Sequence, residues 1–259
     1  MSLKRKRFYE QIINKIILNK DSKILVVGAT MYDYEIFKNN GFSNVTISNL
    51  DENYRYRPYN HSIQDIRKLS FENESFDYVV ANACIHHTSR PHNAIIEMYR
   101  VSKVGIIVIE GNDSKLIKLT NYLKLSQEFE LSAVTKKNNS HDLGGVDNSN
   151  IPNFVYRWTK REIYKLISSY EPQYKHKIYY FYESDFEGYK NVKKIKFVKM
   201  ILYVMEFLAK IYFNLFNQEK NLFCFFINKD ERKIQKWIEI DKENVIKLNQ
   251  KYIKNNIEK

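Results

Sequence analysis

The stretch from Lys23 to Asp51, KILVVGATMYDYEIFKNNGFSNVTISNLD, decides the fold. It begins with an apolar, β-branched run that ends at Gly28 and continues with a short helical pattern that Gly41 is well placed to end. A second strand-like run then closes on Asp51. A strand, a helix and a strand in this order are typical of a unit in a parallel α/β sheet. Because ligands bind at the carboxyl ends of such strands, Gly28 and Asp51 are candidate nucleotide-binding residues.

The same alternation of strands and helices continues along the chain. Pro91 opens a helix with apolar residues at helical spacing, and Thr159 and Glu162 form a capping-box pattern at the start of another helix. Further strand patterns, the first of them a short strand or loop, are found at 61–69, 75–84, 104–110, 177–182 and 222–227. We therefore predict an N-terminal helix over 1–22, a main α/β domain over 23–230 and a C-terminal helical extension over 231–259.

Composition excludes several classes of protein. The chain has 259 residues, 44% of them hydrophobic, which is typical of a globular protein and long enough for a substantial core. Cys84 and Cys224 lack the spacing of a zinc site or a disulfide framework, so we expect a reducing, cytoplasmic setting. Polar residues interrupt the basic N-terminal segment, which argues against a signal peptide. The net charge of +12 attracts anions in general and does not by itself identify a partner.

The segment 194–217 has an unusually broad apolar face for a surface helix, with a narrow stripe of polar residues and tyrosine. Its charges argue against a span across the bilayer. We expect it to belong to a helical insertion over 187–219. Three interpretations stay open: burial against the domain, a homodimer interface, and docking on a membrane surface that would make the protein membrane-associated.

A longer segment carries a family resemblance. Residues 75–110, SFDYVVANACIHHTSRPHNAIIEMYRVSKVGIIVIE, resemble the fourth strand, histidine-containing loop, helix and fifth strand of class I S-adenosylmethionine-dependent methyltransferases, of the type 11-like kind. The resemblance implies a Rossmann-like, doubly wound, mostly parallel seven-stranded sheet with helices on both faces. The segments FELSAV, GGV and IPNFVYRWTKREI resemble a subgroup associated with surface-polysaccharide biosynthesis, which implies a sugar acceptor and a lid over 114–158.

The first loop departs from the family pattern. The family's first loop usually has the pattern D-x-G-x-G-x-G. In this chain Val26 takes the place of the acid, and only Gly28 of the glycines remains. A nicotinamide enzyme requires more glycines around its pyrophosphate, so this class is disfavoured. S-adenosylmethionine has no pyrophosphate and tolerates their loss better. By resemblance, the residues expected to contact this cofactor are Gly28, Ala29, Thr30, Asp33, Asp51, Asp65, Ile66, Asn82 and Ala83.

The acceptor side is expected to lie around the histidines. His86, His87 and His141 are the candidate bases for deprotonating a hydroxyl acceptor, although surface or purely structural roles also fit them. Candidate residues for contact with a small-molecule or glycan acceptor are Glu110, Asp113, Tyr156 and Arg157. No cluster in the sequence has metal-ligand spacing, so we predict no metal.

Two other functions remain open. A non-catalytic scaffold or regulatory protein of the same fold could use the segment 194–217 to bind a partner or a membrane. An RNA methyltransferase is suggested only by the net charge, and no recognisable RNA-binding module accompanies it, so nucleic acid is an unlikely partner. The interpretation we carry forward is a methyltransferase that O-methylates a sugar.

Overall fold

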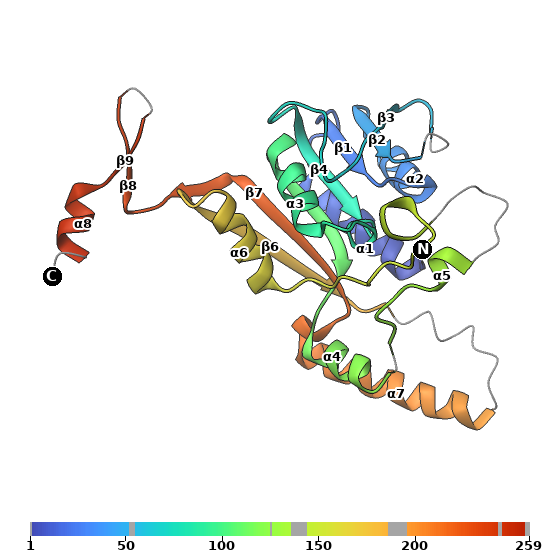
Figure 1. Ribbon diagram of the computed structural model, residues 1–259. Helices are drawn as coiled ribbons and strands as arrows, with labels where there is room; N and C mark the ends of the chain where they lie inside the picture. The colour runs from blue at the N-terminus through green and yellow to red at the C-terminus, as the bar shows by residue number, and fades with distance from the viewer. Residues whose placement is uncertain are drawn as a thin grey trace.

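The computed structural model describes residues 2–51, 55–124, 126–135, 144–185, 196–242 and 245–256. Its centre is a seven-stranded sheet in the order β3-β2-β1-β4-β5-β7-β6 (Figure 1). The predicted α/β class and mostly parallel, doubly wound sheet are confirmed. The strand order reverses between β1 and β4, which is where open α/β sheets bind their ligands.

Five strands of this sheet are parallel. The central strand β1 is buried along its whole length, which explains its continuous apolar sequence. Residues 24 and 26 face one layer of the core and residues 25 and 27 face the other. The parallel strands are β1 (Ile24–Val27), β2 (Val45–Asn49), β3 (Asn60–Ile63), β4 (Phe76–Asn82) and β5 (Ser102–Gly111).

The other two strands complete the sheet as an antiparallel pair. The strand β7 (Leu222–Ile234) lies between β5 and β6 (Tyr174–Glu183) and is antiparallel to both. Gly105 of β5 lies against β7, where a Cβ atom would come within 2.2 Å of the Ile227 carbonyl oxygen. This close approach explains the glycine in an otherwise β-branched strand.

Helices cover both faces of the sheet, as predicted. One apolar core lies under α1 (Leu3–Ile16) and α2 (Met31–Asn39), and the other lies under α3 (Pro91–Val101) and α6 (Lys160–Tyr170). The Thr159 hydroxyl accepts a hydrogen bond from the Glu162 N–H and begins α6 at the predicted cap. Gly41 follows α2 with a φ of 75°, a conformation that glycine adopts without strain.

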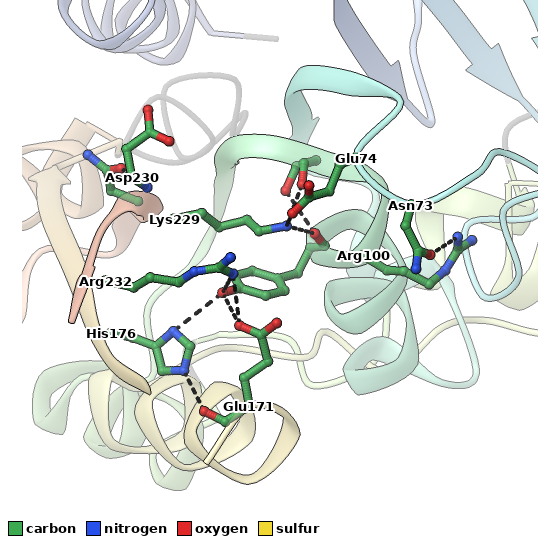
Figure 2. A network of polar contacts seen from close by, with 11 residues as sticks. Asn73, Glu74, Arg100, Glu171, His176, Lys229, Asp230 and Arg232 are labelled. Atoms are coloured by element: carbon green, nitrogen blue, oxygen red, sulfur yellow. Dashed lines mark hydrogen bonds and ion pairs between the residues drawn. The ribbon is translucent and has the colours of Figure 1, made fainter. Parts of the chain in front are cut away.

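A polar network around the buried side chain of Lys229 ties β7 to the start of β5 and to the loop before β4 (Figure 2). Lys229 Nζ donates to the Ser102 carbonyl at 2.6 Å and pairs with Glu74 at 3.0 Å. Arg232 pairs with Glu171 at 3.1 Å. Burial lowers the pKa of Lys229, while the Glu74 carboxylate opposes that shift. The network holds β7 in place next to β5.

The segment after β5 carries α4 (Lys115–Tyr122), α5 (Ser132–Thr135) and a 3₁₀ turn, η2 (Val146–Asn148). The predicted insertion helix is α7 (Lys196–Leu215) (Figure 1). The 3₁₀ turn that follows it, η4 (Asn217–Glu219), contacts α4 through Glu219, which accepts a hydrogen bond from the Leu116 N–H at 3.0 Å. Phe213 of α7 is 2% exposed, whereas Phe207 is 63% exposed and Leu208 57% exposed. The domain boundaries themselves stay predictions.

The predicted C-terminal helix over 231–259 is wrong. The strand β7 continues to Ile234 because Ile234 pairs with Tyr174 of β6, and the chain then forms a hairpin of β8 (Ile238–Ile240) and β9 (Ile246–Leu248). The only helix in the described part of this segment is α8 (Gln250–Asn256). The hairpin and α8 project away from the sheet (Figure 1).

Within the described ranges, no helix combines the length and the apolarity that a bilayer crossing requires.

Candidate active site

A pocket of about 230 Å³ lies at the carboxyl ends of the parallel strands, where the strand order reverses. Its lining comes from the loops after β1, β2, β3 and β4 and from the turn that contains η2. The structure brings six of the nine predicted cofactor residues together here: Gly28, Thr30, Asp51, Asp65, Ile66 and Ala83. One of the candidate bases, His87, lies with them.

The floor of the pocket is formed where β1 and β4 end. Gly28 has a φ of 59°, and the adjacent Cys84 thiol donates to the Val27 carbonyl at 3.3 Å. Ala83 has a φ of 51°, a left-handed conformation that costs a non-glycine residue about 1–2 kcal/mol. Its N–H donates to the Ile109 carbonyl of β5 at 2.9 Å, which stabilises this sharp turn. Such strain is found most often at functional sites.

Three residues predicted to contact the cofactor lie outside the lining of this pocket. The Asp33 carboxylate is 3% exposed and accepts hydrogen bonds from both the N–H and the hydroxyl of Thr30, each at 2.9 Å. It therefore caps the start of α2, and burial raises its pKa. Ala29 is fully buried and donates its N–H to Ser48. Asn82 Oδ1 accepts from Arg5 of α1 at 3.4 Å.

An ion-pair network closes one side of the pocket. Arg67 Nε donates to both oxygens of the Asp65 carboxylate at 2.9 and 3.0 Å, and this hydrogen bonding lowers the pKa of Asp65. Arg67 also pairs with Asp147 of η2, whose Oδ1 accepts from the Ser89 N–H at 2.9 Å. Asp147 thus joins the predicted lid segment to the loops after β3 and β4. This pairing has no local sequence signal because Arg67 and Asp147 are far apart in the chain.

Two adjacent histidines and a glutamate meet beside the pocket. His86 and His87 lie in the 3₁₀ turn η1 (Ile85–His87), which follows β4 and is called the histidine turn below. Nε2 of each ring lies 3.6 Å from Oε2 of Glu130. On its other side, His86 Nδ1 lies 2.7 Å from Oε2 of Glu110. Glu110 is 1% exposed, and its Oε1 accepts from the Ile85 N–H at 2.8 Å.

These contacts shift the pKa values of the two histidines in opposite directions. Burial alone would lower the pKa of His86, but Glu110 and Glu130 outweigh it and raise this pKa to about 9. Contact with His86 in turn lowers the pKa of Glu130 to about 2. Burial and the neighbouring charge of His86 lower the pKa of His87. At neutral pH and without another ligand, His86 is therefore an imidazolium between two carboxylates, and His87 is a neutral imidazole.

The remaining predicted acceptor residues lie away from the pocket lining. Asp113 pairs with Lys118 at 3.1 Å, and one Arg157 nitrogen donates to the Gln127 carbonyl at 3.0 Å. The Tyr156 hydroxyl is hydrogen-bonded to Glu162 at the start of α6. Glu110 contacts the histidine turn and is too deeply buried to reach an acceptor directly. His141 lies outside the described residues.

Glu130 is the residue that the sequence prediction missed. It belongs to the segment FELSAV, which carried a resemblance but no assigned role. Its N–H donates to the Asn153 carbonyl at 3.0 Å, and Asn153 Nδ2 donates to Glu130 Oε2 at 3.4 Å. This pairing of two distant loop segments brings Glu130 to the histidine turn. The cluster depends on tertiary structure and has no local sequence signature.

Comparison with known proteins agrees with this geometry. Residues 34–109 match the family model described as a methyltransferase domain. This segment is thus similar to a methyltransferase domain. The match spans α2 through most of β5 and so includes Asp51, Asp65, His86 and His87. No curated protein has significant sequence similarity to the chain.

Solved structures share the fold over most of the chain. A SAM-dependent methyltransferase from Archaeoglobus fulgidus aligns with a TM-score of 0.51 and 13% identity, covering 86% of this chain and 94% of that one. The PH0226 protein from Pyrococcus horikoshii OT3 aligns with a TM-score of 0.52 and 15% identity, covering 86% and 89%. The [4+2]-cyclase SpnF aligns with a TM-score of 0.50 and 12% identity, covering 86% and 81%. At these identities the likeness concerns the fold, and the family match adds support for S-adenosylmethionine as the cofactor.

Proposed function

We propose that this protein is an S-adenosylmethionine-dependent methyltransferase that O-methylates a sugar hydroxyl in a surface polysaccharide or its precursor. The observation that carries the methyltransferase proposal is the position of the pocket. Gly28, Asp51 and Asp65 line it at the reversal of the strand order, and His87 lines it as well. The sugar acceptor rests on the resemblance of the lid segments to polysaccharide-associated proteins.

The residues of the pocket fit this cofactor. Gly28 allows the backbone to approach the ligand closely, since it has no side chain and adopts a positive φ. The Asp51 carboxylate follows β2, the position from which an acid accepts hydrogen bonds from both ribose hydroxyls in related folds. Asp65 and Ile66 would contact the adenine. When bound, the cofactor supplies an activated methyl group on a sulfonium, so the protein has mainly to align the acceptor.

The acceptor hydroxyl would lie beside the histidine turn. A neutral hydroxyl is a poor nucleophile, and a positioned base accelerates its reaction by about 10²- to 10⁴-fold. His87 suits this role in the metal-free protein because its lowered pKa keeps the imidazole neutral near pH 7. His86 is less suitable, since both of its nitrogens face carboxylates. Glu110 and Glu130 hold the turn in place.

The test is transfer of a labelled methyl group to a panel of monosaccharides, sugar nucleotides and oligosaccharides. We expect label on a sugar oxygen, with one S-adenosylhomocysteine formed for each methyl transferred. His87→Gln should lower the rate by about 10²-fold or more. His92→Gln is the matched control because His92 pairs with Glu162, outside the pocket lining. Transfer only to amines or RNA would contradict the sugar acceptor, and no transfer from a cofactor that binds would contradict the enzyme.

A further inference from the structure

The contacts between the histidine turn and Glu130 have the spacing of a metal site. Nε2 of His86 and Nε2 of His87 each lie 3.6 Å from Glu130 Oε2, and the three candidate ligand atoms lie within 4.8 Å of one another. A hydrogen bond between such groups would be shorter, at about 2.7–3.2 Å. Two atoms that each lie about 2.1 Å from a tetrahedral metal are separated by about 3.4 Å. Both distances from a histidine nitrogen to Glu130 Oε2 are close to this value.

A histidine–glutamate pair elsewhere in the protein provides a comparison. His92 Nε2 lies 2.9 Å from Glu162 Oε1, a direct hydrogen-bonding distance. In the cluster of His86, His87 and Glu130, by contrast, two rings converge on one oxygen and neither reaches it. The ring centroids of His86 and His87 lie 4.4 Å apart, so the two rings lie side by side.

The surroundings of His86 are those of a metal ligand. Its Nδ1 lies 2.7 Å from the buried Glu110 carboxylate, which leaves Nε2 directed toward Glu130. Histidines that bind metals almost always donate their other ring N–H to a carboxylate, a carbonyl or water, which fixes the tautomer and orients the ring. Glu110 is itself held by the Ile85 N–H at 2.8 Å. The carboxylate–histidine pair of such a site, Glu110 and His86, is therefore present in the structure.

We propose that His86, His87 and Glu130 bind a divalent first-row transition metal such as Zn²⁺, with Glu110 orienting His86. Two imidazoles and one carboxylate suit zinc and its neighbours better than Mg²⁺ or Ca²⁺, which prefer sites composed entirely of oxygen. This assignment differs from the sequence prediction of no metal. Three protein ligands leave a tetrahedral metal with one open position, as in catalytic rather than structural zinc sites.

The open position gives the metal a role that rests on the proposed function. His87 lines the cofactor pocket, and the side chains of His87 and Glu130 are 32% and 35% exposed, so a small molecule can approach the cluster. A hydroxyl oxygen bound to the metal has a strongly lowered pKa. In the metal-bound protein, coordination would thus replace His87 as the means of deprotonating an acceptor, and the released proton would pass to water.

The test is titration of the chelator-treated full chain with Zn²⁺ in a calorimeter and with Co²⁺ in a spectrophotometer. We expect one Zn²⁺ per chain and the intense visible bands of four-coordinate Co²⁺. Glu130→Gln and His87→Gln should weaken Zn²⁺ binding by more than about tenfold, and Glu110→Gln by about 10- to 100-fold through His86. His92→Gln should leave it unchanged. Circular dichroism confirms that each variant is folded.

The same samples are titrated with S-adenosylhomocysteine, which separates the two proposals. No Zn²⁺ binding to the wild-type chain, or equal binding by wild type and Glu130→Gln, overturns the metal site. If S-adenosylhomocysteine still binds, the proposed function stands without the metal. If Zn²⁺ binds as expected but S-adenosylhomocysteine does not, the metal site stands and the methyltransferase proposal fails.

Discussion

Gly28 lies so close to Cys84 that a Cβ atom added to residue 28 would come 2.5 Å from the Cys84 Cβ and 2.8 Å from its Sγ. The single glycine that remains in the first loop is therefore required by the packing of β1 against the turn after β4. This contact places the floor of the pocket. It also explains why this glycine is present although the family's other loop glycines are missing.

Gly28→Ala should destabilise the protein and abolish binding of S-adenosylhomocysteine. The left-handed backbone alone costs alanine about 1–2 kcal/mol, and displacement of Cys84 adds to that. Gly41→Ala is the matched control, because Gly41 also has a positive φ but its Cβ would meet no atom within 4 Å. We expect Gly41→Ala to lower the unfolding free energy by about 1 kcal/mol and to retain binding. Equal effects of the two substitutions on urea-induced unfolding and on binding would contradict this explanation.

Asp147→Asn should speed the release of S-adenosylhomocysteine. The substitution removes the charge that pairs the lid with Arg67, while asparagine still tolerates the left-handed φ of 51° at this position. For a partly exposed pair worth about 1 kcal/mol we expect an increase of about fivefold in the dissociation rate, measured by stopped-flow displacement. Asp113→Asn breaks the pair with Lys118 and should leave the rate unchanged. An unchanged rate in Asp147→Asn would show that the pair does not hold the lid closed.

Glu97→Gln should lower stability at neutral pH and have less effect in acid. The Glu97 carboxylate accepts hydrogen bonds from Arg100 Nε and the Leu69 N–H, each at 2.8 Å, and Arg100 lowers its pKa below the ordinary value of 4.5. Because the folded-state pKa is the lower one, the stabilisation is complete above pH 4.5 and is lost as the pH falls through the folded pKa. We expect a loss of about 1–2 kcal/mol at pH 7, shrinking below pH 4.5.

Urea-induced unfolding followed by circular dichroism at several pH values measures this difference. Glu72→Gln is the control, since Glu72 is an exposed residue of the loop that contains Leu69, and a surface substitution should change stability by less than about 0.5 kcal/mol. A Glu97→Gln difference that stays constant from pH 7 into acid would show that the ionised carboxylate is not the cause.

The sequence predicted the parallel half of the sheet well because its signals are local. The strands β1, β2, β4 and β5 are each marked by a short apolar run, and the cap at Thr159 is visible within four residues. The strand β3, NHSI, has no such run and was predicted only as a short strand or loop. The C-terminal segment was mispredicted as a helix because its structure depends on a distant partner. Pairing of Ile234 with Tyr174 extends β7 through charged residues that have no strand pattern of their own.

The residues of the candidate site also divide into those with a sequence signal and those that only tertiary contacts bring together. Asp51 could be placed from its distance to Gly28 along the chain and Asp65 from the family resemblance, and both line the pocket. Asp33 was expected to contact the cofactor, but its position in the first turn of α2 turns the carboxylate toward Thr30. Glu130 joins His86 and His87 only through the pairing of its loop with Asn153, and no spacing in the sequence reports such a contact.

Phe213→Ala should destabilise the protein far more than Phe207→Ala, although both residues lie on α7. Phe213 is 2% exposed, so its truncation should cost about 3–5 kcal/mol. Phe207 is 63% exposed, so its truncation should cost less than about 0.5 kcal/mol. Urea-induced unfolding at two protein concentrations measures both. A large, concentration-dependent loss in Phe207→Ala would instead show that a second copy of the chain covers this face.

The central claim is that the pocket between β1 and β4 binds S-adenosylmethionine through Asp51. Isothermal titration with S-adenosylhomocysteine tests it most directly, with Asp51→Asn as the variant and Asp21→Asn as its control. Asp21 lies just before β1, at the end of this strand opposite the pocket, and its carboxylate accepts a hydrogen bond from the Ser43 hydroxyl. We expect one binding site per chain. The affinity should fall by more than about tenfold in Asp51→Asn, because hydrogen bonds to a charged group are worth about 1.5–3 kcal/mol. It should be unchanged in Asp21→Asn. No binding to the folded wild-type chain, or equal binding by all three proteins, would contradict the claim.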